Sequence, residues 1–116
     1  MVVHVVRIRT VLRNLPEELN VITVLPSGGV EFRFFRRQVE SVSIVGTFNG
    51  WREGEAPMQE LGDGWWRAEL NLGDGLYQFR YIADGQWFTD FAAHGVEHSK
   101  WGINSLVVLG RARAAA

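Results

Sequence analysis

The stretch GWWRAELNLGDGLYQFRYIADG, residues 64–85, decides the fold class of this chain. Every second residue from Trp66 to Leu72 is apolar, and the residues between them are charged or polar. Residues 76–83 alternate likewise, with aromatic side chains at 77, 79 and 81, although Leu76 and Ile82 make the opposite face mixed. An alternation of period two places successive side chains on opposite faces of a β-strand. The stretch therefore predicts two strands, each with one core-facing side.

Turn signals recur along the chain at intervals of about one strand and one turn. Asn49-Gly50, Asp63-Gly64, Asp74-Gly75 and Asp84-Gly85 each supply the positive φ values that tight hairpin turns require. We expect six strands, at residues 29–36, 42–45, 65–72, 76–83, 86–89 and 105–109. Short strands at this spacing predict an all-β antiparallel sandwich.

The two ends of the chain lack this rhythm. Residues 1–29 are interpreted as an N-terminal arm, with strand-like segments at 5–13 and 21–25 and a short helical turn at 15–19. The segment Pro26-Ser27-Gly28-Gly29 is the predicted boundary. The sandwich is expected at 30–110, and the tail 111–116, which has no periodicity, is expected to fray.

Composition limits the class of protein. The 116 residues carry a formal net charge of −1, which argues against a dedicated nucleic-acid binder. Cysteine is absent, which excludes disulfides and thiolate chemistry. The apolar run at the N-terminus is too short, and too interrupted by Arg7 and Arg9, for a signal peptide or a membrane helix. We therefore expect a cytoplasmic protein of one domain that does not bind membranes.

Two tryptophans lie where a ring is more readily displayed than buried. Trp51 follows the Asn49-Gly50 turn, and Trp87 follows the Asp84-Gly85 turn. Displayed rings suggest a ligand, whereas the alternative is that they cover the end of the core. Since neighbours in a strand point to opposite faces, Trp66 is expected in the core and Trp65 at the surface or in an interface.

Five segments in order, at residues 45–51, 56–58, 64–66, 77–90 and 104–108, resemble the family-48 carbohydrate-binding modules. These are the early-set, immunoglobulin-like domains found beside isoamylases and glycogen branching enzymes and in the β subunits of AMP-activated kinases. The resemblance covers residues 30–109. It implies an immunoglobulin-like sandwich that binds α-1,4-glucans, such as glycogen, starch and maltooligosaccharides, without catalysis or cofactor.

The resemblance also implies a carbohydrate site. Trp51 and Trp87 match the stacking tryptophans of the family, Asn104 matches a hydrogen-bonding asparagine, and Arg80 stands where the family usually carries a lysine. From residue type and position alone, Asn104 is equally a turn residue bonded to its own backbone, and Arg80 a solvated strand residue.

The loop at residues 98–103 departs from the family. Within this loop, Trp101 offers a third aromatic surface. Lys100 and Gln86 are further candidates for fixing the orientation of a sugar.

Catalysis and metal binding are not expected. Asp63, Asp74 and Asp84 each precede a glycine and are explained as turn residues, and Asp90 as a loop residue. His94 and His98 have a helical metal-ligand spacing, but Gly95 and Val96 disfavour a helix and no third ligand is adjacent.

A protein-interaction or dimerisation module is the alternative function. It would use the arm as an added edge strand and the basic cluster Arg33, Arg36 and Arg37, with an enzyme of glycogen metabolism or a second copy of the chain as partner. The two interpretations differ in whether Trp51 and Trp87 are exposed beside Arg80 and Asn104 or buried beneath the arm.

Overall fold

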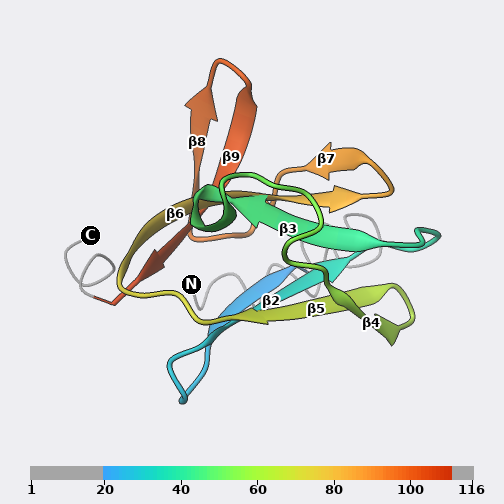
Figure 1. Cartoon of the computed structure of the whole chain (residues 1–116), viewed down its shortest axis with the longest axis horizontal. Coiled ribbons are helices and arrows are strands. Elements are labelled where there is room, and N and C mark those ends of the chain that lie inside the picture. The colour runs from blue at the N-terminus through green and yellow to red at the C-terminus, as the bar shows by residue number, and fades with distance from the viewer. Residues whose placement is uncertain (1–19, 111–116) are drawn as a thin grey trace, which may run out of the picture.

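The computed structural model describes residues 20–110, which form two antiparallel sheets packed face to face (Figure 1). The first sheet has the order β1-β2-β5-β4, formed by Val21–Val24, Val30–Phe35, Trp65–Leu70 and Gln59–Gly62. The second has the order β3-β6-β9-β8, formed by Val42–Gly46, Gly75–Ala83, Gly102–Leu109 and Gly95–Ser99. β7, Gln86–Phe88, pairs with β6. The predicted all-β sandwich is confirmed.

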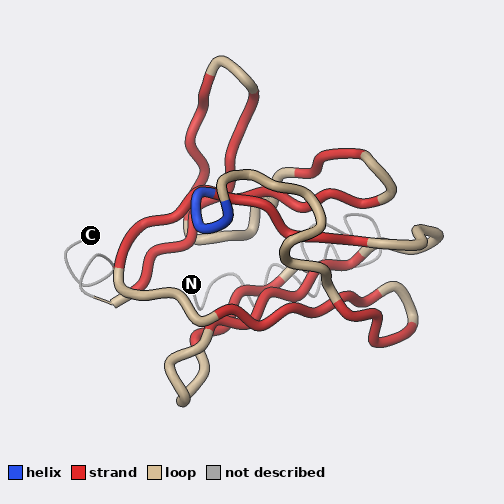
Figure 2. Tube along the Cα trace, in the orientation of Figure 1, coloured by secondary structure: helices blue, strands red, loops and turns tan. Residues whose placement is uncertain are grey.

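Helical structure in the described residues is limited to one short 3-10 turn, η2, at Thr47–Asn49, shown in blue in Figure 2. No helix in this part of the chain is long and apolar enough to cross a membrane.

The core lies between the sheets and consists of inward-facing side chains from strands of both sheets. Phe32 of β2 meets Phe79 of β6 edge-on with ring centroids 5.2 Å apart, and Phe34 stacks on Tyr81 at 4.4 Å. Trp66 is buried and its ring nitrogen donates to the carbonyl of Arg36, as the alternation predicted for a core residue. The aromatic stripes of β2, β5 and β6 therefore bind the two sheets together.

Two strands were not predicted, β4 and β8. Their side chains are exposed or half-buried on both faces, so no apolar alternation marks them in the sequence. β8 pairs with β9 from Gly95↔Leu106 to Ser99↔Gly102, which makes the predicted loop at 98–103 the tip of a hairpin. β9 accordingly begins at Gly102, three residues before the predicted start.

The predicted arm is only partly described. Val21–Val24 forms β1, which pairs with β2 from Val21↔Arg33 to Val24↔Val30 and is therefore part of the first sheet. The expected strand at 5–13, the helical turn at 15–19 and the tail at 111–116 lie outside the described residues.

Asp90 follows β7 and is completely buried. Its carboxylate accepts hydrogen bonds from the Ala92 N–H at 2.9 Å and the Tyr81 hydroxyl at 3.4 Å, and its own N–H donates to Ser105 Oγ at 2.6 Å. Burial raises the pKa of Asp90 to about 6. The predicted loop residue thus anchors the segment after β7 to β9.

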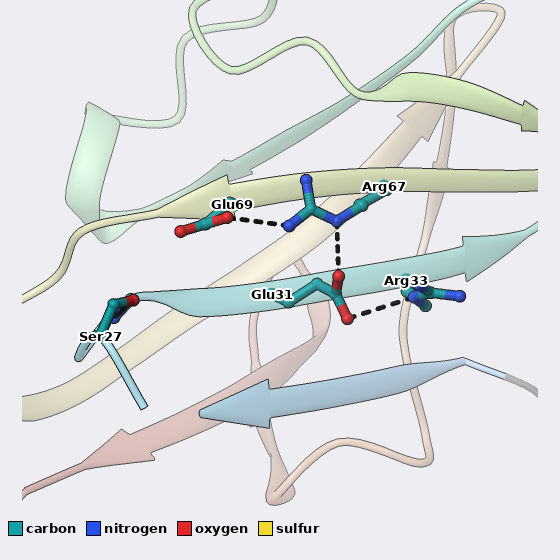
Figure 3. A network of polar contacts seen from close by, with 6 residues as sticks. Ser27, Glu31, Arg33, Arg67 and Glu69 are labelled. Carbon is teal, nitrogen blue, oxygen red and sulfur yellow. Dashed lines mark hydrogen bonds and ion pairs between the residues drawn. The ribbon is translucent and has the colours of Figure 1, made fainter. Parts of the chain in front are cut away.

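The outer face of the first sheet carries a network of ion pairs (Figure 3). Glu31 of β2 accepts from Arg67 of β5 and, at 3.1 Å, from Arg33, and Arg67 also donates to Glu69 at 2.8 Å. The hydrogen bond from Arg67 lowers the pKa of Glu31. Acids and bases in this network neutralise one another.

Candidate functional site

A groove of about 460 Å³ lies on the second sheet, where β6, β7 and the β8–β9 hairpin come together with the turn after η2. Seven residues line it: Trp51, Gln78, Arg80, Trp87, Ser99, Trp101 and Asn104. Five of the seven residues suggested by the sequence are among them. Lys100 lies beside the groove, with its Nζ 5.1 Å from the centroid of the Trp101 ring, and Gln86, exposed at the start of β7, is not in the lining.

Trp51 follows a turn whose backbone is fixed by three hydrogen bonds. The Gly46 N–H donates to Asn49 Oδ1 at 3.0 Å, Asn49 Nδ2 donates to the Ile44 carbonyl at 3.2 Å, and the Trp51 N–H donates to the Gly46 carbonyl at 2.9 Å. A Cβ at Gly46 would lie 2.3 Å from the Gln78 carbonyl oxygen, so only glycine fits. Trp51 has φ +61°, a left-handed conformation that bulky residues rarely adopt. Such strain is typical of binding sites.

Trp87 comes from β7 and lies beside Trp51. The two ring centroids are 6.4 Å apart and the ring planes are inclined by 26°. Trp87 is 47% exposed, and Trp51 is half-buried. The structure therefore brings the predicted pair together as two nearly parallel rings that are open to solvent.

Arg80 projects from the outer face of β6 into the same groove, beside the Trp87 ring. Its Nε donates to Asn104 Oδ1 at 2.7 Å, its Nη2 donates to the Trp101 carbonyl at 3.2 Å, and its Cζ lies 5.7 Å from the centroid of the Trp87 ring. No carboxylate in the described part of the chain forms an ion pair with it. Two of its five N–H groups are engaged, which leaves three for a ligand.

Asn104 lies deep in the groove, since it is only 7% exposed and belongs to β9. Besides accepting from Arg80, it donates through Nδ2 to Gln78 Oε1 at 3.3 Å. Gln78 Nε2 in turn donates to Glu97 of β8. The asparagine is thus not a turn residue bonded to its own backbone. It belongs to a chain of polar side chains across β6, β9 and β8, of which Arg80, Asn104 and Gln78 line the groove.

Trp101 occupies the tip of the β8–β9 hairpin and is 79% exposed. Its N–H donates to Ser99 Oγ at 3.1 Å, and the Ser99 hydroxyl donates to the Gly102 carbonyl at 3.0 Å. These bonds fix the backbone of the tip and do not involve the indole, which within the described residues contacts Lys100. The predicted third aromatic surface is therefore present in the groove.

Two lining residues, Gln78 and Ser99, were not among the predicted site residues. Gln78 shares the outer face of β6 with Arg80, and the alternation of this strand was a signal that could have found it. Ser99 carried no such signal, because its place depends on the pairing of β8 with β9.

The lining of the groove combines aromatic rings with hydrogen-bonding side chains. Among the seven lining residues there is no carboxylate and no histidine. Within residues 20–110, no three histidine, aspartate or glutamate side chains gather to hold a metal ion. His94 instead accepts the Val108 N–H on Nδ1 at 3.0 Å, at the edge of β9. Flat aromatic faces bordered by hydrogen-bonding side chains suit the apolar faces and hydroxyl edges of sugar rings.

A two-sheet sandwich with such a groove has the architecture of a carbohydrate-binding module. The family model described as the glycogen recognition site of AMP-activated protein kinase matches residues 35–111, and the chain belongs to this family. Membership of a glycogen-recognition family implies binding of an α-glucan.

The similar curated proteins are branching enzymes. The 1,4-alpha-glucan branching enzyme GlgB of Mycobacterium ulcerans (strain Agy99) is 48% identical over 61 residues, and that of Mycobacterium tuberculosis (strain ATCC 25618 / H37Rv) is 46% identical over 63. That of Mycolicibacterium paratuberculosis (strain ATCC BAA-968 / K-10) is 40% identical over 62 residues. Each match covers 49% of this chain and 8% of the enzyme, so the likeness is to a small part of each enzyme.

Proposed function

We propose that the chain binds α-1,4-linked glucans in this groove and does not itself transform them. The observation that carries the proposal is the convergence of Trp51 and Trp87, as nearly parallel rings, on an arginine that has no acidic partner in the described residues. Membership of the glycogen-recognition family supplies the class of sugar.

The aromatic pair would provide most of the affinity. The rings are inclined by 26°, so consecutive glucosyl units of a bent chain could lie on one ring each. Burial of their C–H faces against indole is favourable by about 25 cal/mol per Å². The exposure of Trp87 and Trp101 also favours this function over an interaction module in which the rings would be covered.

The polar groups would fix orientation. Arg80 has three N–H groups left for sugar hydroxyls. Gln78 and Ser99 line the same groove and offer further hydrogen-bonding groups. Because the groove is open and few groups are fixed, affinity for a short oligosaccharide should be weak, on the order of micromolar to millimolar. Tight retention on a polymer would require several modules acting together.

Glycoside hydrolysis normally requires two carboxylates across the scissile bond, and none lines this groove. The branching activity of the relatives belongs to proteins of which this chain spans 8%. A role in presenting a glucan to an enzyme therefore fits the groove better than chemistry within it.

Titration with maltoheptaose, monitored by calorimetry and by tryptophan fluorescence, tests the proposal. Trp87→Ala should weaken binding by about 1–3 kcal/mol and leave folding intact, since Trp87 lies outside the core. Trp65→Ala is the matched control, because Trp65 packs on Phe35 in the other sheet, with ring centroids 5.3 Å apart. Equal losses in the two variants, or no binding by the unmodified protein, would contradict the proposed site.

A further inference from the structure

Two features that set this chain apart from the family meet at one contact. The sequence has Arg80 where the family usually carries a lysine, and its loop at 98–103 departs from the family. In the structure the Arg80 Nη2 donates to the carbonyl of Trp101, at the tip of that loop, at 3.2 Å. The same guanidinium donates through Nε to Asn104 Oδ1 at 2.7 Å. Arg80 therefore bridges β6, β9 and the hairpin tip.

The hairpin has a gap that admits this guanidinium. Gly102 has φ +125°, and a Cβ built on it would lie 2.8 Å from Arg80 Nη2 and 3.4 Å from its Cζ. A side chain at this position would displace the guanidinium. The missing side chain at Gly102 thus leaves the space that the Arg80 guanidinium occupies. This fit is a second observation, independent of the hydrogen bond.

The hairpin needs an external support, because it projects away from the sandwich (Figure 1). β8 is an edge strand whose residues Val96 to Ser99 are exposed, so little apolar packing fixes its direction. The bonds of Ser99 close the tip on itself and attach it to nothing else. Near the tip, the bond from Arg80 attaches the hairpin to β6, and the Thr89 hydroxyl attaches it to the segment after β7 by donating to the Ile103 carbonyl at 2.6 Å. The Gln78–Glu97 bond lies further down the hairpin, so Arg80 is the contact that reaches Trp101 itself.

We propose that Arg80 is a positioning residue that fixes Trp101 as a third sugar-contacting ring, and that the ligand is an α-glucan segment long enough to reach it from the Trp51–Trp87 pair. This inference rests on the proposed function. A lysine could keep the positive charge but not the two diverging bonds, since an ammonium is a point charge without a planar fork. Arg80 thus contributes to sugar binding by positioning Trp101, in addition to any sugar hydroxyl that it contacts directly.

The first test needs no ligand. Backbone order parameters of Trp101 and Gly102 should be near 0.85 in the unmodified protein, as for rigid backbone, and should fall toward about 0.6 in Arg80→Lys. Arg67→Lys, on the opposite sheet, is the matched control and should leave the hairpin unchanged. Unchanged order parameters in Arg80→Lys, in a variant with an unaltered melting temperature, would overturn the positioning role.

The second test compares two ligands. Maltoheptaose should bind more tightly than maltotriose, and Trp101→Ala should reduce this advantage about tenfold, while Trp87→Ala weakens both ligands. Arg80→Lys should reproduce the loss of the advantage seen in Trp101→Ala. An advantage that survives Trp101→Ala overturns the third contact. If neither ligand binds the unmodified protein, the proposed function fails, and the order parameters still decide whether Arg80 supports the hairpin.

Discussion

The two outer faces of the sandwich use arginine in opposite ways. On the first sheet, Arg67 donates to Glu31 and Glu69, and these bonds raise its pKa (Figure 3). On the second sheet, Arg80 donates to an amide oxygen and a carbonyl oxygen, neither of which carries a charge. The charge of Arg67 is balanced by neighbouring carboxylates, whereas Arg80 is oriented by neutral acceptors that leave its charge unbalanced.

This difference separates a structural face from a binding face. Carboxylates that pair with arginine satisfy its charge as well as its N–H groups, and a surface pair of this kind adds little stability. Neutral acceptors orient a guanidinium without cancelling its charge, so its remaining donors stay available to a ligand. The acceptors around an arginine can therefore indicate which face of a sandwich binds a ligand.

The comparison extends to two carboxylates whose pKa values shift in opposite directions. Burial raises the pKa of Asp90 from 3.8 to about 6, so the folded state favours its protonated form. Its contribution to the free energy of unfolding should therefore fall by about 3 kcal/mol as pH rises from 4 through 6, and be level above that range. Urea unfolding at several pH values measures this, and Asp90→Asn should remove the slope. A slope that persists in Asp90→Asn would assign it to other groups.

The second largest effect is expected when the two arginines are replaced one at a time. Arg80→Leu should weaken maltoheptaose binding about tenfold, because it removes the free donors and the support of Trp101. Arg67→Leu should leave binding unchanged, since Arg67 lies on the opposite sheet. Calorimetry on both variants makes the comparison. Equal effects would mean that the two faces do not differ as the hydrogen bonds indicate.

The smallest effect concerns Glu31, whose lowered pKa arises mainly from the hydrogen bond of Arg67. Its stabilising contribution is present at neutral pH and is lost as pH falls through the lowered folded-state value, opposite to Asp90. Glu31→Gln should cost about 1 kcal/mol of stability at pH 7 and less in high salt, because the partners that cover Glu31 are themselves partly exposed. Sugar binding should not change. Thermal unfolding at two salt concentrations provides the measurement.

The parts of the fold that were predicted are those in which a strand has one buried face. β5 alternates along its length and β6 as far as Tyr81, and the core residues Trp66, Phe79 and Tyr81 lie where the alternation placed them. β4 and β8 have no buried face, so their sequences carry no period, and only pairing with a neighbour makes them strands. Turn chemistry and alternation are local signals, whereas the position of an edge strand is a tertiary one.

The site divides in the same way. Trp51 and Trp87 follow recognisable turns, and the structure brings them together. The depth of Asn104 and the contribution of Ser99 depend on how β8 lies against β9, which no short-range pattern encodes. The bond between Arg80 and Trp101 joins residues 21 positions apart, and the sequence marked each as a candidate without linking them.

The left-handed backbone at Trp51 has a consequence for the speed of recognition. Because the turn from Gly46 fixes this residue through its own hydrogen bonds, the indole face is already in place when a sugar arrives. Association with a preformed surface requires no slow rearrangement, so different glucans should bind at similar rates. They should differ in residence time, and a longer chain would stay on the module longer rather than find it sooner.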